Sequence, residues 1–239
     1  MSNNPFQSPI ANRPPKQPTI TAPSQQYQFK PIRGLSICLV VCALAISVLG
    51  MTISISEVVL ESIWPGFNDP NLEFPTETAA FVAMLMAAVG VLGLIPSLAV
   101  VALGPMFSYR SNANARSLGA DHLEYTPGWN AGFWFIPIVN LFRPFQATSE
   151  VFHASEDFRH MQSSAMSPFL GLWWTFYLVG NGISNVESRL ALRGIYSADW
   201  FHLLSFASSS FVLIGGILYI RIVLRIAESQ TVAAKYKID

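Results

Sequence analysis

Residues 79–107 read AAFVAMLMAAVGVLGLIPSLAVVALGPMF and contain no charged side chain. About 20 apolar residues in a helix suffice to cross the hydrocarbon core of a bilayer, which is roughly 30 Å thick. A helix on the core of a soluble protein would carry polar residues at every third or fourth position, and this stretch does not. Residues 79–107 therefore predict a membrane-spanning helix.

Three other apolar segments have the same character, at residues 34–56, 169–186 and 201–220. Hydrophobic residues make up 51% of the chain and charged residues only 12%, a balance that is unusual for a soluble domain. We therefore expect an all-α fold, an integral membrane four-helix bundle built from these four spans.

The first 33 residues differ in composition from the remainder of the chain. Residues 1–33 are rich in Pro, Gln, Asn and Ser and show almost no periodic apolar pattern. Nothing in such a segment offsets the entropy of ordering it, so we expect a disordered cytoplasmic N-terminal tail. Residues 34–239 then form one transmembrane domain, with an insert on the cytoplasmic face at residues 109–167.

Basic residues are distributed unevenly between the connections. If both termini are cytoplasmic, 12 of the 14 Lys and Arg residues lie on the cytoplasmic side, as the positive-inside rule requires. The connection between the first two spans instead carries five carboxylates and no basic residue. We expect a multi-pass protein of the cytoplasmic (inner) membrane with the N-terminus and the C-terminus inside.

The insert contains a further apolar stretch, residues 129–142, which includes Pro137 and Asn140. This stretch is too short to span a bilayer, since a spanning helix needs about 20 residues. A fifth span there would also move basic residues to the outside, against the charge rule. The stretch is therefore expected to be interfacial or re-entrant, and the sequence leaves both possibilities open.

Residues 107–155 read FSYRSNANARSLGADHLEYTPGWNAGFWFIPIVNLFRPFQATSEVFHAS. Together with Trp173 and Trp174, the ordered combination of polar, proline and aromatic residues in this segment resembles the signature of a bacterial integral-membrane family, domain of unknown function 4328. The resemblance covers about residues 80–225 and implies a bacterial membrane protein, but no reaction. The residues that carry it are Arg110, Asn114, Leu118, Gly119, Pro127, Gly128, Trp129, Phe135, Ile136, Pro137, Ile138, Val139, Asn140, Leu141, Phe142, Arg143, Pro144 and Gln146.

Arg110 and Asn114 share a helical face just beyond the second span. Arg110 could reach the acidic headgroups of the membrane surface, where a basic residue contributes about 1 kcal/mol. It could instead pair with Glu150 and hold the insert against the helices.

A second group of residues consists of helix breakers and polar side chains at membrane depth. Pro137, Asn140 and Pro144 would break a helix and free backbone carbonyls, as in the discontinuous helices of transporters. Asn181 and Asn185 stand four residues apart in the third span. Polar residues inside a span are candidates for a functional site, but they could equally form hydrogen bonds between helices.

Glu150 and His153 have the Glu-x-x-His spacing that places two metal ligands on one helical face, and His160 follows. Di-iron sites in four-helix bundles need two such motifs, and this chain has one. A solvated amphipathic helix explains the same residues, so neither a metal nor another cofactor is expected.

The chain contains no nucleotide-binding loop, nucleophile elbow or zinc-protease motif, and nothing in it predicts nucleic-acid binding. Small residues repeat at every fourth position in the second span, at Ala79, Ala83 and Ala87, and such faces favour helix association. Our first hypothesis is therefore a non-enzymatic structural, scaffold or regulatory membrane protein. It would act in the lipid bilayer through protein partners or as a homo-oligomer.

Two alternatives remain open. The first is a small transporter or channel with a site near Pro137, Asn140, Asn181 and Asn185. The second is a metal-dependent membrane enzyme that uses Glu150, His153 and His160. A cavity that joins the asparagines to the helix break would favour transport, a fully packed bundle would favour a scaffold, and converging Glu and His side chains would favour the enzyme.

Overall fold

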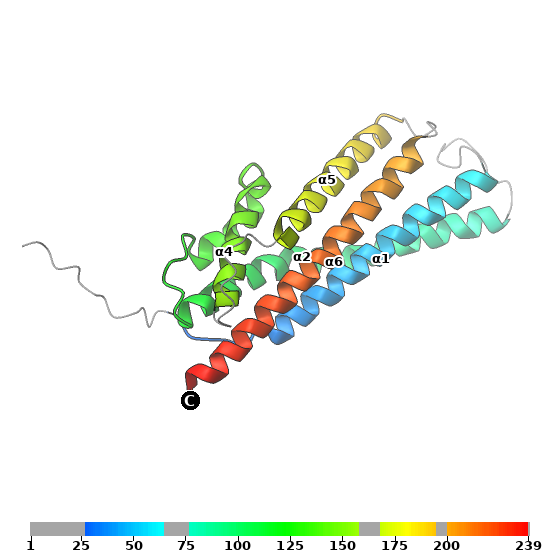
Figure 1. The fold of residues 1–239 in the computed structure, drawn as a ribbon. Helices are drawn as coiled ribbons and strands as arrows, with labels where there is room; N and C mark the ends of the chain where they lie inside the picture. The colour runs from blue at the N-terminus through cyan, green and yellow to red at the C-terminus, as the bar shows by residue number, and fades with distance from the viewer. Residues whose placement is uncertain (1–26, 65–76, 158–167, 195–199, 239) are drawn as a thin grey trace, which may run out of the picture.

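The computed structural model describes residues 27–64, 77–157, 168–194 and 200–238, and within these ranges the chain is all-helical with no strand (Figure 1). Both prolines of the second helix, Pro96 and Pro105, lie inside one continuous helix. The elements in chain order are α1 (Arg33–Ile63), α2 (Glu77–Ser117), α3 (Pro127–Gly132), the short 3-10 helices η1 (Phe133–Phe135) and η2 (Val139–Leu141), α4 (Arg143–Asp157), α5 (Pro168–Ala191) and α6 (Trp200–Ile238).

Three of the described helices are long and apolar enough to cross a membrane: Arg33–Ile63, Ala80–Ser117 and Trp200–Tyr236. They contain the first, second and fourth predicted spans. The third predicted span lies in α5, whose asparagines, glycines and aromatic residues make it less hydropathic. α5 runs alongside α6 (Figure 1), and a membrane span at α5 stays a prediction.

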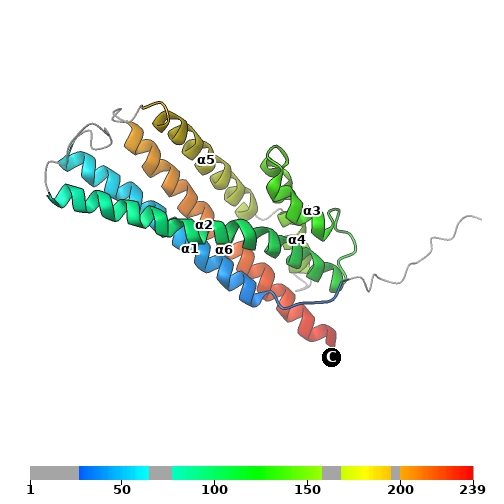
Figure 2. The same cartoon turned by 180° about the vertical axis from the view of Figure 1, so that it is seen from behind.

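The four long helices are arranged as a row in the order α5, α6, α1, α2 (Figures 1 and 2). α6 packs against both α5 and α1, and α1 packs against α2. α2 and α5 stand at opposite ends of the row and make no substantial contact with each other. The predicted four-helix bundle is therefore open on one side.

Glycines allow α6 to approach its neighbours closely. A Cβ added at Gly216 would lie 2.9 Å from Ser47 Oγ of α1, and one at Gly180 would lie 3.1 Å from Val212. Small residues that let backbones approach are a general device of helix packing in membranes. Serine hydroxyls add hydrogen bonds at the same contact, since Ser54 Oγ of α1 is 2.6 Å from Ser209 Oγ of α6.

The insert packs at the end of the row where α1 begins and α6 ends (Figure 1). α2 ends before Gly119, which has a φ of 110°, a left-handed conformation that glycine adopts without strain. Thr126 caps α3 by accepting a hydrogen bond from the Trp129 N–H at 3.4 Å. Ile136 is extended because it precedes Pro137, and this separates η1 from η2.

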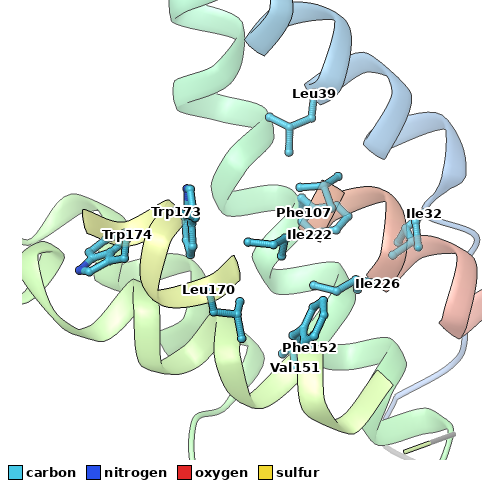
Figure 3. Packing of buried hydrophobic residues seen from close by; sticks show 12 residues of the cluster. Ile32, Leu39, Phe107, Val151, Phe152, Leu170, Trp173, Trp174, Ile222 and Ile226 are labelled. Carbon is cyan, nitrogen blue, oxygen red and sulfur yellow. The ribbon is translucent and has the colours of Figure 1, made fainter. Parts of the chain in front are cut away.

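The largest cluster of buried apolar side chains lies where the insert meets α1, α2, α5 and α6 (Figure 3). Leu170, at the start of α5, has no exposed surface, and Trp173 follows it on the same helix with 3% exposed. The other labelled members of the cluster are Ile32, Leu39, Phe107, Val151, Phe152, Trp174, Ile222 and Ile226.

Candidate functional site

A groove of about 430 Å³ lies between α2 and α5, which do not meet. α1 and α6, the inner helices of the row, contribute its floor, and η1 and η2 close it toward the insert. Its lining residues are Ala43, Ile46 and Ser47 of α1; Val100, Val101, Gly104 and Pro105 of α2; Trp134, Phe135 and Asn140 of the insert; Trp173, Tyr177 and Asn181 of α5; and Val212, Gly215, Gly216 and Tyr219 of α6.

None of these lining side chains carries a charge, and most are apolar. Asn140 Oδ1 is buried and makes no hydrogen bond of normal geometry within the described residues. Asn181 Nδ2 donates to the Tyr177 carbonyl oxygen at 2.8 Å, and no described residue donates to Asn181 Oδ1. The groove is thus an apolar space lined by two asparagines whose amide oxygens accept no hydrogen bond of normal geometry from a described residue.

α2 adds a backbone acceptor to the groove wall. Pro105 has no N–H, so the carbonyl oxygen of Val101, four residues earlier, loses its usual helical partner. Both residues line the groove.

The structure therefore brings Asn140 and Asn181 to one groove, but not the other residues proposed with them. Pro137 is exposed between η1 and η2, and Pro144 is buried in the first turn of α4. Asn185 is exposed and donates to the Asn181 carbonyl oxygen at 2.8 Å.

The sequence analysis missed Tyr177 and Tyr219, which supply the phenol groups of the groove. Tyr177 lies one helical turn before Asn181 and therefore shares its face. That spacing is a signal that could have identified it. Tyr219 offered no comparable local signal, because its place depends on how α6 packs beside α5.

A different polar network holds the insert to the C-terminal end of α2. Arg116 Nε donates to Asn112 Oδ1 at 3.1 Å, and Arg116 Nη2 donates to the carbonyl oxygens of Leu123 and Tyr125 at 2.8 and 3.0 Å. Asn112 Nδ2 donates to the same Tyr125 carbonyl at 2.9 Å. These bonds fix the turn between α2 and α3.

The proposed pairing of Arg110 with Glu150 does not occur among the described residues. Glu150 Oε2 instead accepts a weak hydrogen bond from the Tyr125 N–H at 3.5 Å, and burial raises the pKa of this carboxyl group. Asn114, which was predicted to share a helical face with Arg110, forms hydrogen bonds with the chain before α1. Its Oδ1 accepts from the Lys30 N–H at 2.9 Å and its Nδ2 donates to the Lys30 carbonyl at 2.8 Å.

Arg143, Gln146 and Trp129 contribute to the internal packing of the insert. Arg143 Nη1 donates to Gln146 Oε1 at 2.9 Å and to the Tyr125 hydroxyl, and its guanidinium lies 5.4 Å from the centre of the Tyr125 ring. The Trp129 ring stacks on Phe133 with 5.6 Å between centroids, although 57% of Trp129 is exposed.

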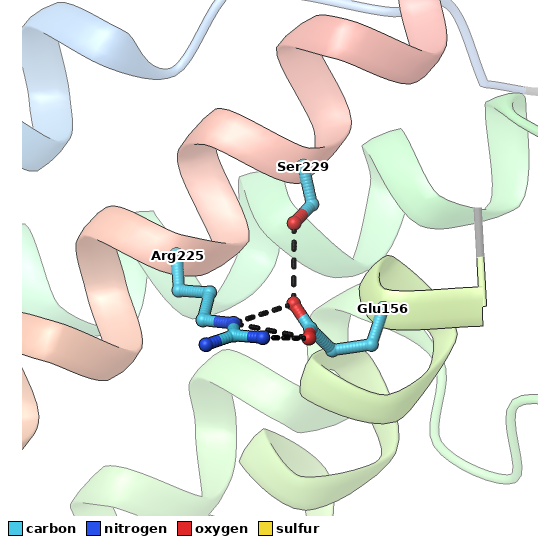
Figure 4. Close-up of polar contacts among 3 residues, drawn as sticks. All are labelled: Glu156, Arg225 and Ser229. Carbon is cyan, nitrogen blue, oxygen red and sulfur yellow. Dashed lines mark hydrogen bonds and ion pairs between the residues drawn. The ribbon is translucent and has the colours of Figure 1, made fainter. Parts of the chain in front are cut away.

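An ion pair joins α4 to α6 (Figure 4). Arg225 Nε and Nη2 donate to the Glu156 carboxylate at 2.6 to 3.0 Å, and Ser229 Oγ donates to Glu156 Oε1 at 3.3 Å. The Glu156 side chain is only 8% exposed. This pair links residues far apart in the sequence, and no local pattern indicated it.

No group of three or more His, Cys, Asp or Glu side chains that could hold a metal comes together in the described part of the chain. His160 lies outside the described residues, so the complete proposed set with Glu150 and His153 is not seen.

Three long apolar helices, a polar insert and a groove between the edge helices define the class: an all-helical protein with helices suited to cross a membrane. The family model for a domain of unknown function, DUF4328, matches residues 72–228, more than half of the chain. The protein therefore belongs to this family. No curated protein and no solved structure matches the chain.

Proposed function

We propose that this protein is a small membrane transporter or carrier whose substrate binds in the groove between α2 and α5. The observation that supports this proposal is that one groove brings Asn140 and Asn181 together. Discontinuous helices with free polar groups are common at the substrate sites of transporters. The short helices η1 and η2 provide such a break beside Asn140.

The lining chemistry favours an uncharged, partly apolar substrate. A charged group in an apolar space needs a charged or hydrogen-bonding partner to offset its lost hydration. The groove lining offers amide, phenol and hydroxyl groups, and no charge. A neutral amphiphile with one hydrogen-bond donor near Asn181 Oδ1 would satisfy that oxygen while its apolar part lies against α2 and α6.

The proposed location is the cytoplasmic (inner) membrane with both termini inside. The start of α1 and the ends of α2 and α6 lie at one end of the helical row (Figure 2). This end carries Arg33, Arg110, Arg116, Arg225 and Lys235, which is the arrangement that the positive-inside rule favours for the cytoplasmic side. Reporter fusions to the C-terminus should be active in the cytoplasm, and an external C-terminus would refute this topology.

The groove can be tested by cysteine accessibility in membrane vesicles. Cys38 and Cys42 do not line the groove and can be replaced, after which single cysteines are placed at Asn140, Asn181 and the exposed apolar position Leu98. A membrane-impermeant thiol reagent should label positions 140 and 181 but not 98. Silence at both groove positions, with an external control reacting, would contradict a hydrated substrate path.

A matched pair of glycine substitutions makes this test specific to the groove. Gly104 lines the groove and Gly90 does not, and at both positions nothing lies within 4 Å of an added Cβ. Gly104→Leu should fill the groove and protect a cysteine at position 181 from labelling. Gly90→Leu should leave the labelling unchanged.

A scaffold or regulatory role, through protein partners or a homo-oligomer, is the second candidate. It is supported by the exposed apolar face of α2, where the most apolar 18-residue window has no buried residue. Such a face fits either lipid or another helix. Disulfide crosslinking of single cysteines at Leu85 and Leu98 between copies would support it, whereas labelling of the groove would not be required.

A further inference from the structure

A second cavity, of about 550 Å³, lies at the cytoplasmic end of α2, beside the segment that precedes α1. Tyr27, Gln28 and Lys30 line one side of it, and Tyr109, Arg110 and Asn114 line the other. Two of these residues are basic, and none of the described lining residues is acidic. The cavity is therefore electropositive and rich in hydrogen-bond donors.

The two basic side chains in this cavity have no partner within the described residues. Other arginines at this end of the protein are occupied, since Arg116 binds backbone carbonyls and Arg225 binds Glu156. Arg110 is half-buried and makes neither a hydrogen bond nor an ion pair there, and Lys30 is held only through its backbone. An unpaired guanidinium has a rigid fork of donors that matches the oxygens of a phosphate group.

The position of Lys30 is fixed before any ligand binds. Asn114 forms two hydrogen bonds with the Lys30 backbone, and Ile32, two residues later, is 1% exposed in the main apolar cluster. Binding therefore costs little entropy for ordering this segment, which favours affinity.

The cavity also borders an apolar surface. Met106, one helical turn before Arg110, is 49% exposed, and Tyr109 is 42% exposed. A cationic pocket directly beside an exposed apolar helix face suits a ligand with a phosphate group and an acyl chain. Basic residues near an anionic bilayer surface attract such a ligand electrostatically.

From these observations we propose that the Lys30–Arg110 cavity binds the phosphate group of an anionic phospholipid from the cytoplasmic leaflet. Arg110 and Lys30 contact the phosphate oxygens, and Tyr27 and Tyr109, which also line the cavity, add hydroxyl donors. The acyl chains lie along the exposed face of α2 that contains Met106. This site is separate from the groove and does not require that the protein transports anything.

The test measures binding of short-chain phosphatidylglycerol to the purified full-length protein in a neutral detergent. Arg110→Gln and Lys30→Gln are compared with Arg221→Gln, which removes an exposed arginine near the same end of α6 that does not line the cavity. The Arg110 and Lys30 variants should weaken binding at least about tenfold, the equivalent of 1.4 kcal/mol. Arg221→Gln should bind like the unmodified protein. Added salt should weaken the binding of lipid both by Arg221→Gln and by the unmodified protein.

Because Arg110 has no partner within the described residues, Arg110→Gln should melt at the same temperature as the unmodified protein without lipid. Equal binding by the Arg110 and Arg221 variants would overturn the proposal. A second experiment tests whether inorganic phosphate or glycerol phosphate displaces the bound lipid. If either one displaces the lipid at an equal concentration, the ligand is a soluble phosphate and the assignment to phospholipid is wrong.

Discussion

The two halves of α2 have opposite surroundings although they belong to one uninterrupted helix. In the first half apolar side chains are exposed, for example Val91 at 65% and Ile95 at 70%. In the last turns polar side chains are buried, with Asn112 at 0% and Asn114 at 1%. Exposed apolar residues fit a helix surrounded by lipid, whereas buried and hydrogen-bonded polar residues fit one enclosed by a folded insert.

The same contrast distinguishes the insert, where most stabilising contacts lie, from the groove between α2 and α5. The main apolar cluster, the Arg116 network and the Glu156–Arg225 pair all lie at the insert. The groove borders this cluster, since Trp173 belongs to both, and it continues along the helices between α2 and α5. We therefore expect substitutions at the insert to affect stability and substitutions in the groove to affect binding.

The largest expected effect compares two leucines, one in the main apolar cluster and one on the exposed face of α2. Leu170→Ala removes a side chain with no exposed surface from the main cluster and should lower the free energy of unfolding by about 2 to 5 kcal/mol. Leu98→Ala removes a side chain that is 70% exposed and should change it by less than about 0.5 kcal/mol. Denaturation followed by tryptophan fluorescence measures both, and equal losses would contradict the contrast.

A second pair of variants tests the polar contacts of the insert. Arg225→Ala leaves the Glu156 carboxylate buried without its cation and should cost about 2 to 3 kcal/mol, somewhat less than for a fully buried pair because Arg225 is itself 44% exposed. Arg221→Ala, one turn earlier on α6, removes an exposed arginine and serves as the control. Thermal denaturation in detergent distinguishes the two, and a similar melting temperature for both would show that the pair contributes little.

The third prediction concerns the chain before α1. Asn114→Ala removes both hydrogen bonds to the Lys30 backbone and should cost about 1 to 2 kcal/mol. The loss should be local, so amide hydrogen exchange should accelerate at residues 28–32 while the middle of α6 is unaffected. Asn185→Ala, at an exposed position on α5, should change neither measurement.

The fold could be predicted from the sequence where the signal was local. Long uncharged runs predicted the all-helical fold, and three of the four predicted spans correspond to helices with the required length and hydropathy. Pro137 predicted a break in the insert, and it lies between η1 and η2. The open row could not be predicted, because the periodicity of a single helix does not say which helices will fail to meet.

The same distinction applies to the candidate site. Asn140 and Asn181 stood out because polar groups in an apolar stretch are unusual. The sequence did not indicate that Arg225 is the partner of Glu156, since the two residues lie 69 positions apart. The partner proposed for Arg110 was wrong for a related reason: the turn between α2 and α3 places the Tyr125 N–H, rather than Arg110, against Glu150.

The smallest expected effect is the pH dependence that Glu150 introduces. Burial raises the pKa of its carboxyl group above the ordinary value of 4.5, although backbone hydrogen bonds from Tyr125 and Glu124 partly oppose this. Above pH 4.5 the folded protein therefore holds this proton more tightly than the unfolded chain, so the contribution of Glu150 to stability falls as the pH rises through the raised pKa.

Glu150→Gln cannot ionise and can still accept the Tyr125 hydrogen bond. The two proteins should melt together at pH 4, and the variant should become slightly more stable between pH 5 and 7. If the unmodified protein gained stability over the variant in that range, attraction to Arg116 would outweigh burial, and the insert would be more open to water than its packing indicates.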